Sequence, residues 1–230
     1  MPNFDIIRTN KTDLTFRVSS VISKFDLQSN ESTEHFKGKI DLSNDWKIGL
    51  IVGKSGSGKT TIAKQLFEDF YITNFKYTDK SILDDMPNYC PVSDITNAFN
   101  SVGFSSPPSW LKPYSVLSNG EKMRCDLARA ILEKNEMIVF DEFTSVLDRN
   151  VAKIGSFAIQ KAIRKSDKKF IAVGCHYDVE DWLMPDWVFN TDTMTFHSFE
   201  GQKKKDQKLN STYTKQKTNQ FGKCLLNIII

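Results

Sequence analysis

The sequence predicts an α/β fold built on a mainly parallel β-sheet. Residues 46–52 (WKIGLIV) read as a short buried strand, followed by a glycine-rich loop and by a segment with apolar residues at helical spacing. Residues 137–140 (MIVF) and 170–176 (FIAVGCH) are two more apolar runs of strand length, and residues 150–165 between them have a helical pattern. Strands that alternate with helices in this way favour a parallel sheet.

Length and composition indicate one substantial domain. The chain has 230 residues, of which 40% are hydrophobic and 26% charged, as in an ordinary globular protein. The N-terminus shows no secretory signal, and no apolar stretch approaches the roughly 18 residues needed to cross a bilayer, so we expect a cytoplasmic protein without direct membrane insertion. Four cysteines without C-x-x-C spacing and three histidines that do not cluster with them indicate neither a disulfide framework nor a zinc site.

Two segments near the N-terminus predict an antiparallel β subdomain. Residues 13–25 (DLTFRVSSVISKF) and 34–42 (EHFKGKIDL) alternate apolar and polar side chains, which is typical of half-buried strands. The polar segment between them, QSNEST, reads as a loop. We therefore expect these two strands to pair ahead of the glycine-rich loop.

Residues 53–60 (GKSGSGKT) match the Walker A pattern G-x-x-x-x-G-K-[ST] without a mismatch. The glycines let the backbone turn tightly and aim successive N–H groups at phosphate oxygens, and the following helix adds partial positive charge. Lys59 supplies an ammonium for the β- and γ-phosphates, and the Thr60 hydroxyl suits Mg²⁺. The predicted nucleotide-binding residues are Gly53, Ser55, Gly56, Gly58, Lys59, Thr60 and Thr61.

The apolar run 137–140 ends in two acids. A P-loop ATPase needs a carboxylate at a strand end to hold the Mg²⁺ shell opposite its Ser or Thr, and Asp141 occupies that position. The next residue, Glu142, would lie near the γ-phosphate, where a carboxylate can accept a proton from the attacking water. The pair predicts Mg²⁺-dependent ATP hydrolysis, with Asp141 as metal ligand and Glu142 as catalytic base.

The middle of the chain reads as helical. Ser93 is placed to cap a helix over residues 94–102, and residues 117–134 (LSNGEKMRCDLARAILEK) form a second helical pattern. Ser118 and Gly120 at its start make an anion-binding helix terminus. We predict a reduced helical insert at about 76–120, within an ATPase domain that covers residues 1–200.

The sequence LSNGE at 117–121 resembles the LSGGQ signature of ABC-type ATPases, and residues 144–148 (TSVLD) resemble the D-loop of that family. The resemblance implies an ATP-dependent homodimer, in which Ser118 and Gly120 of one chain close over the γ-phosphate held by the P-loop of the other. It also implies that Asp148 lies at this interface and that His176 contacts the γ-phosphate. Taken alone, Asp148 could cap the next helix, and His176 could be a capping or core histidine.

The sequence departs from the family pattern at several positions. Asn119 and Glu121 replace Gly and Gln of the signature, and Phe143 replaces the proline that commonly follows the acid pair. The resemblance also implies an aromatic residue that stacks on adenine from the N-terminal sheet. Phe25 is at a plausible distance ahead of the P-loop, and Phe16 is the alternative.

The segment between the two phosphate motifs bears on the process that ATP drives. Only 57 residues separate Thr60 from Leu117, fewer than transporter ATPases usually have there, and no glutamine lies between the P-loop helix and Leu117, where the family has its Q-loop. Asp84 or Asp85 occupies about that place. We therefore expect a soluble ATPase with a non-transport function. The alternatives are the ATP-binding subunit of a transporter with a separate membrane permease, and a nucleic-acid-associated ATPase.

The C-terminal residues 201–230 form a basic tail. They carry seven lysines and one aspartate, whereas the rest of the chain has a formal charge of −3. This composition predicts a solvated, disordered terminus, and the competing interpretation is an arm that binds nucleic acid through lysine–phosphate contacts and stacking by Tyr213 and Phe221. The apolar end, LLNIII, is expected to pack on the domain or on a partner.

Overall fold

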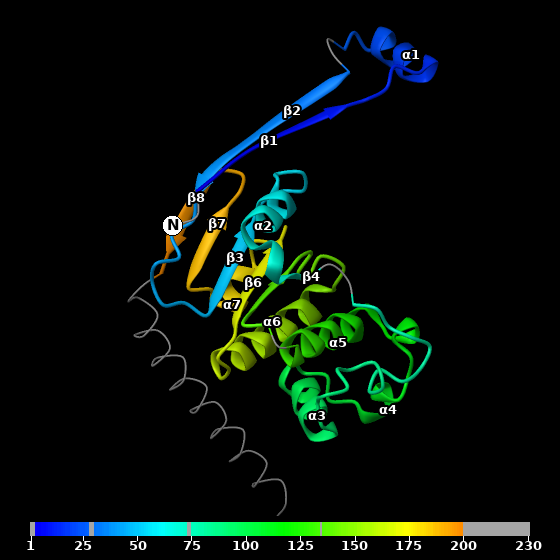
Figure 1. Cartoon of the computed structure of the whole chain (residues 1–230), viewed down its shortest axis with the longest axis vertical. Coiled ribbons are helices and arrows are strands. Elements are labelled where there is room, and N and C mark those ends of the chain that lie inside the picture. The colour runs from blue at the N-terminus through cyan, green and yellow to red at the C-terminus, as the bar shows by residue number, and fades with distance from the viewer. Residues whose placement is uncertain (1–2, 28–29, 73–74, 134, 200–230) are drawn as a thin grey trace, which may run out of the picture. The chain divides into compact units, whose positions relative to one another are not determined.

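The computed structural model describes residues 3–27, 30–72, 75–133 and 135–199 (Figure 1). Within these residues the strands form two sheets: a six-stranded sheet in the order β4-β5-β6-β3-β7-β8 and a two-stranded sheet of β1 and β2. Residues 1–197 form one compact unit. The basic tail predicted at 201–230 lies outside the described residues.

The six-stranded sheet contains the predicted parallel core. β3 pairs in parallel with β6 and β7, and β5 pairs in parallel with β4 and β6. All five residues of β3 are buried, as expected for a strand that is covered on both faces. Because these strands run in one direction, the residues that follow β3, β5 and β6 meet at one edge of the sheet. The strands are β3 (Ile48–Val52), β4 (Tyr71–Ile72), β5 (Met137–Phe140), β6 (Lys169–Gly174), β7 (Trp187–Asn190) and β8 (Thr195–Ser198).

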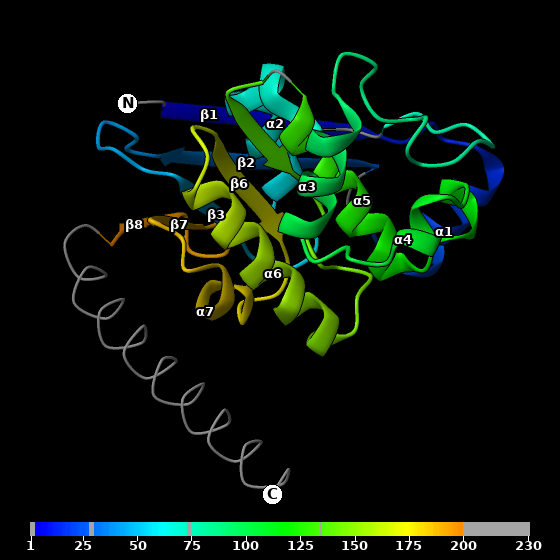
Figure 2. The same ribbon diagram turned by 90° about the horizontal axis from the view of Figure 1, so that it is seen from below.

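Helices follow most of these strands, as the alternating pattern predicts. α2 contacts β3, β4 and β6, while α3, α5 and α6 contact one another (Figure 2). Among the described residues, no helix is both long and apolar enough to cross a membrane. The helices are α2 (Lys59–Phe67), α3 (Val92–Ser101), α4 (Pro107–Trp110), α5 (Asn119–Leu132), α6 (Arg149–Arg164) and α7 (Val179–Leu183), with two 3₁₀ turns, η1 (Glu68–Phe70) and η2 (Tyr114–Val116).

The segment between β4 and α5 has its own aromatic core. The ring of Phe99 lies 5.3 Å from Phe104 and 5.4 Å from Trp110, and the Trp110 indole N–H donates to the Phe104 carbonyl at 2.9 Å. The prediction that Ser93 caps the helix over residues 94–102 is wrong by two residues. This helix, α3, begins at Val92, and its N-cap is Pro91. Proline at this point already has the extended φ of −66° that a cap requires, so Ser93 falls inside the first turn.

The antiparallel N-terminal sheet is present, with a different first strand from the one predicted. β1 (Asn3–Lys11) pairs with β2 (Glu31–Lys39), and Lys11 lies opposite Glu31 at the end of the register. Phe4 and Phe36 are the buried residues of the two strands, and the Phe4 ring packs edge-on against Phe189 at 5.6 Å. The end of the hairpin that holds Phe4 and Phe36 is therefore part of the core.

The strand predicted at 13–25 is wrong: Phe16–Lys24 forms a helix, α1, at the closed end of the hairpin (Figure 1). Thr15 caps it by accepting a hydrogen bond from the Val18 N–H at 3.3 Å. Val18, Val21 and Ile22 recur at helical spacing, which outweighs the short alternation at Phe16 and Val18. No residue of α1 is buried.

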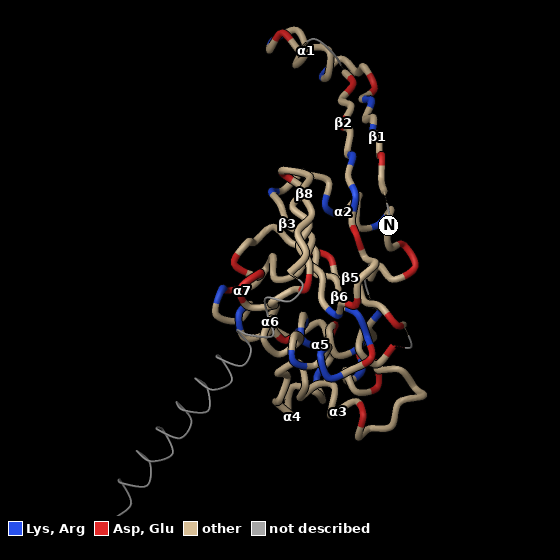
Figure 3. Tube along the Cα trace, turned by 90° about the vertical axis from the view of Figure 1, so that its left-hand side faces the viewer, with Lys and Arg blue, Asp and Glu red and all other residues tan. Residues whose placement is uncertain are grey.

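Charged residues of both signs are interspersed along the hairpin (Figure 3). Lys11 pairs with Glu31 across the strands at 2.7 Å, and Lys37 lies 3.6 Å from Asp5. Exposed pairs of this kind contribute little stability. The hairpin thus has no strong field of one sign.

Candidate nucleotide-binding site

The P-loop leaves the buried end of β3 and enters α2. Gly56 and Gly58 have φ values of +82° and +83°, a backbone region that glycine adopts at little cost. A Cβ on Gly58 would lie 2.5 Å from the Phe36 ring, and one on Gly53 would lie 2.1 Å from the Thr191 hydroxyl. Among the described residues, nothing lies within 4 Å of the Cβ position of Gly56, so the top of the loop is open.

Residues after β7 brace the P-loop from the side. The Thr191 N–H donates to the Val52 carbonyl at 2.8 Å, and the Asp192 carboxylate accepts from the Lys54 N–H at 2.9 Å. The Tyr177 hydroxyl, and then the Lys54 N–H, hold the pKa of Asp192 below its usual range. Sequence reasoning missed this brace, whose only signal is a polar NTD segment at the end of an apolar strand.

Lys59 is the first residue of α2 and is only 8% exposed. Its ammonium donates to the Lys54 carbonyl at 2.7 Å, so it lies across the mouth of the loop. Thr60 and Thr61 follow in the first turn of the helix, and Ser55 is exposed in the loop. The predicted phosphate-binding residues therefore lie together in the P-loop and the first turn of α2.

Three groups donate to Asp141, the first residue after β5. The Thr60 hydroxyl donates to Asp141 Oδ2 at 2.8 Å, the Tyr71 hydroxyl donates to the same oxygen, and the Glu142 N–H donates to Oδ1 at 2.8 Å. Burial, and then the contact with Asp141, raise the pKa of Tyr71, so this hydroxyl remains a donor. A carboxylate beside a threonine hydroxyl supplies the hard oxygen donors that Mg²⁺ prefers.

Glu142 lies beside a cleft of about 420 Å³ between the end of β5 and α5. Its φ of +51° is uncommon for a residue with a side chain, and such conformations concentrate at functional sites. The next residue, Phe143, is buried against Phe140 and Phe170, and its N–H donates to the Val173 carbonyl at 2.8 Å. Phe143 thus anchors the turn where the family commonly has proline.

Ser118 is the N-cap of α5, as predicted, but its polar groups already have a partner. Its N–H and hydroxyl donate to Glu121 Oε2 at 3.0 and 2.8 Å, and the Ser109 hydroxyl donates to Oε1 at 2.8 Å. These bonds, the backbone one from Ser118 first, lower the pKa of Glu121. Gly120 faces α6, since a Cβ there would lie 2.9 Å from Val151.

The remaining motif residues also lie after the strand ends. Asp148 caps α6 by accepting from the Asn150 N–H at 2.9 Å, so the helix-capping alternative for this residue is realised. His176 is half-buried just beyond β6, and its carbonyl accepts from the Val179 N–H at 3.4 Å. Their contacts with γ-phosphate stay predictions.

The two proposed adenine-stacking residues are not on the sheet. Phe16 and Phe25 belong to α1 and its C-cap and are 87% and 65% exposed. The register of β2 separates Glu31 from Phe36, whose ring lies at Gly58, by five residues or about 16 Å of strand. The helix therefore carries both aromatic rings beyond the hairpin end, and adenine stacking by Phe25 or Phe16 stays a prediction.

Asp84 and Asp85 do not reach the cleft. Asp84 accepts from the Ser81 hydroxyl at 2.6 Å, and Asp85 accepts from the Thr78 N–H and hydroxyl at 2.9 and 2.8 Å. Both carboxylates therefore stabilise their own turn.

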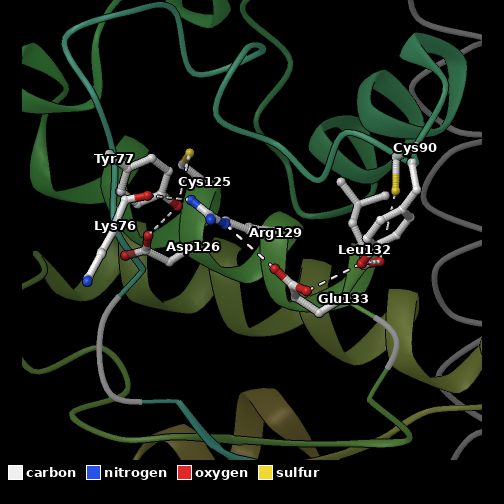
Figure 4. A network of polar contacts seen from close by, with 9 residues as sticks. Lys76, Tyr77, Cys90, Cys125, Asp126, Arg129, Leu132 and Glu133 are labelled. Carbon is white, nitrogen blue, oxygen red and sulfur yellow. Dashed lines mark hydrogen bonds and ion pairs between the residues drawn. The ribbon is translucent and has the colours of Figure 1, made fainter.

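A polar and aromatic network ties the segment after β4 to α5 (Figure 4). The Tyr77 and Tyr114 rings stack 3.9 Å apart, and each hydroxyl donates to the Asp126 carboxylate at 2.7 Å. Arg129, one turn further along α5, donates to the Lys76 carbonyl at 2.8 Å. Burial raises the pKa of Asp126. The network thus holds α5 against the segment that follows β4.

Known proteins that are similar to this chain are ATP-binding proteins and ATP-binding cassettes. No protein-family model matches the chain. It is 25% identical over 222 residues to the lactococcin-G-processing and transport ATP-binding protein LagD of Lactococcus lactis subsp. lactis, covering 75% of this chain and 31% of that protein. It is 29% identical over 157 residues to the probable peptide export ATP-binding protein YydI of Bacillus subtilis (strain 168), covering 59% of this chain and 72% of that protein.

Among solved structures, the fold matches the ATP-binding cassette MJ0796 in a dimeric post-hydrolysis state bound to ADP and Pi. The TM-score is 0.61 over 86% of this chain and 98% of that chain, at 12% identity. These relatives and the solved cassette together support an ABC-type P-loop ATPase. The predicted resemblance to ABC-type ATPases is thereby confirmed, and so is the predicted α/β fold class. The ATPase spans about a third of the length of LagD, so what LagD does as a whole does not transfer with the match.

Proposed function

We propose that this ATPase binds ATP with Mg²⁺ and hydrolyses it at the interface of a homodimer. The observation that carries the proposal is the meeting of Thr60, Asp141 and Glu142 at the carboxyl ends of β3 and β5. Lys59 and the P-loop N–H groups bind the phosphates, while Thr60 and Asp141 hold the ion, which neutralises charge on the phosphate oxygens. Glu142 accepts the proton of the attacking water.

The second half of the site comes from the partner chain. Ser118 and Gly120 at the start of α5 close over the γ-phosphate, and Asp148 and His176 line the same interface. The dimeric state named for the MJ0796 structure supports this arrangement, because that cassette has the same fold. Mass action then makes dimerisation depend on ATP.

The test of the catalytic assignment is Glu142→Gln. This variant should bind a fluorescent ATP analogue as the wild type does and lose turnover by about 10²- to 10⁴-fold, because only the proton acceptor is removed. Glu136→Gln, at the opposite end of β5, is the matched control and should hydrolyse ATP at the wild-type rate. Unchanged turnover in Glu142→Gln would refute the role of Glu142.

For the process that hydrolysis drives, we propose a soluble, non-transport function. The support is the short segment between β4 and α5 and the missing glutamine, which leave little surface for a permease. The names of LagD and YydI favour the alternative, an ATP-binding subunit that pairs with a separate membrane permease. A role on nucleic acid through the basic tail is the further alternative.

A pull-down from native lysate with solubilised membranes separates these functions. A non-transport ATPase should recover no polytopic membrane protein, and a transporter subunit should recover its permease in stoichiometric amount. The Glu142→Gln variant with ATP is the best bait, because it holds the nucleotide-bound state. Recovery of a permease would overturn the non-transport assignment and leave the ATPase assignment intact.

A further inference from the structure

Tyr71 brings a hydroxyl to the predicted metal site from a strand that no sequence motif marks. β4 has two residues, and its register places Tyr71 opposite Val139, two positions before Asp141. From there the Tyr71 hydroxyl donates to Asp141 Oδ2, the oxygen that also accepts from Thr60. Three elements therefore meet at one carboxylate oxygen: α2, β4 and the end of β5.

The ring of Tyr71 is held in place independently of its hydroxyl. It is half-buried against the main hydrophobic core, and the Lys64 ammonium of α2 lies 5.0 Å from the ring centre. Packing therefore accounts for the aromatic ring. It does not account for the hydroxyl, whose described partners, Asp141 and Thr60, both belong to the predicted metal site.

The hydrogen bonds of Asp141 show what the hydroxyl can do. Oδ1 is held by the Glu142 N–H, which moves with the same turn, and Oδ2 is held by Thr60, itself a predicted ligand. Tyr71 is thus the donor to Oδ2 that does not ligate the ion. Donors of this kind orient a ligating carboxylate, and their loss typically costs 10- to 100-fold in metal affinity.

We propose that Tyr71 is a positioning residue for the Mg²⁺ ion, holding Asp141 in the orientation that serves the metal. The inference rests on the proposed ATP site and deepens it. It assigns to β4 a contact with the metal site in a chain that has no glutamine between α2 and the signature.

The experiment compares nucleotide binding with and without the metal in Tyr71→Phe. In EDTA, the affinity for a fluorescent ATP analogue should stay within about twofold of the wild type, because the P-loop is unchanged. The Mg²⁺ concentration that produces half of the metal-dependent change in affinity for the ATP analogue should rise about 10- to 100-fold. Mn²⁺ paramagnetic resonance on the protein–ATP complex gives a second readout that does not depend on turnover.

Tyr77→Phe is the matched control. It also removes a tyrosine-to-aspartate hydrogen bond from a partly buried ring, at Asp126 on α5 and not at Asp141. Its Mg²⁺ dependence should equal that of the wild type. A shift of the same size in both variants would mean that general loosening of the fold, and not the Asp141 contact, sets metal affinity.

The remaining outcomes also decide the matter. An unchanged or lower Mg²⁺ requirement in Tyr71→Phe would overturn the proposal and leave Tyr71 as a packing residue. Loss of ATP binding in EDTA would overturn it too, because Tyr71 would then support the P-loop as a whole. If the wild type itself shows no Mg²⁺-dependent nucleotide binding, the proposed function fails and not only the role of Tyr71.

Discussion

Two helix N-termini are predicted to bind phosphate, and they differ in how they are capped. α2 begins after Gly58, which has a left-handed backbone and no side chain to cap the helix. α5 begins after Ser118, whose hydroxyl takes part in a complete capping box with Glu121. The first terminus leaves its N–H groups for a ligand, whereas the second already holds an anion, the carboxylate of its own chain.

This difference indicates an order of events. A single chain can bind ATP at α2 without breaking an existing side-chain cap. At α5 the Ser118 hydroxyl must leave Glu121 before it can reach the γ-phosphate of a partner. In the described chain the signature is a helix start stabilised by its own capping box, and under the proposed function we predict that it binds phosphate only when the dimer closes.

The largest effect should follow from removing the positive charge of Lys59 at the N-terminus of α2. Lys59→Ala deletes the ammonium at the mouth of the P-loop, and hydrogen bonds to charged groups are worth about 1.5–3 kcal/mol each. Nucleotide affinity should fall by the matching factor, and hydrolysis should disappear. Equilibrium titration with a fluorescent ATP analogue measures the first effect and phosphate release the second. Wild-type affinity in this variant would contradict the role of α2.

A smaller effect should follow from adding a methyl group to the P-loop. Gly58→Ala forces a side chain into the left-handed region, at a cost of about 1–3 kcal/mol, and also drives it against the Phe36 ring. Gly56 has nearly the same φ as Gly58 but open space around its Cβ position. Gly56→Ala should therefore be destabilised only by the backbone strain. Urea unfolding of both variants gives the two costs. Equal destabilisation would mean that the contact with Phe36 has no role.

The smallest effect should come from changing Glu121 at the N-terminus of α5, where the capping box is complete. Glu121→Gln removes a negative charge from the place that a partner's γ-phosphate must approach, so ATP-dependent dimerisation should strengthen by several-fold. The lowered pKa of Glu121 keeps the carboxylate ionised at neutral pH, and its contribution to the cap is lost only as pH falls through that lowered value. The two proteins should therefore differ most at neutral pH and converge in acid. Light scattering with ATP across this range tests the expectation, and weaker dimerisation of Glu121→Gln at neutral pH would contradict it.

The sequence predicted those parts of the site that local chemistry determines. The P-loop and Asp141 follow from a glycine pattern and from strand ends, and parallel strands necessarily bring such ends together. Tyr71 could not be found this way, because its contact depends on the register of β4 against β5. The partner of Ser118 could have been found, since a Ser followed three residues later by Glu is the capping-box pattern.

The N-terminal hairpin shows why the rest of the fold escaped sequence reasoning. β1 has a single buried residue, Phe4, so the strand carries almost no hydrophobic pattern and is defined by its pairing with β2. The segment that did carry apolar residues, around Val18 and Ile22, folded as α1. Short alternation and short helical spacing cannot be separated when neither segment is buried.

Hydrolysis at a site shared by two chains is the central claim, and mixing two inactive variants tests it most directly. Lys59→Ala has an intact signature, and Ser118→Arg has an intact P-loop, with bulk and charge where the phosphate must enter. Each should be inactive alone, and mixed dimers should regain ATP hydrolysis, because one of their two sites combines the intact halves. Titrating one variant into the other should give a maximum in phosphate release at an intermediate ratio. Absence of any activity in the mixture, with both variants folded and the Ser118→Arg chain still binding ATP, would contradict a site completed by the second chain.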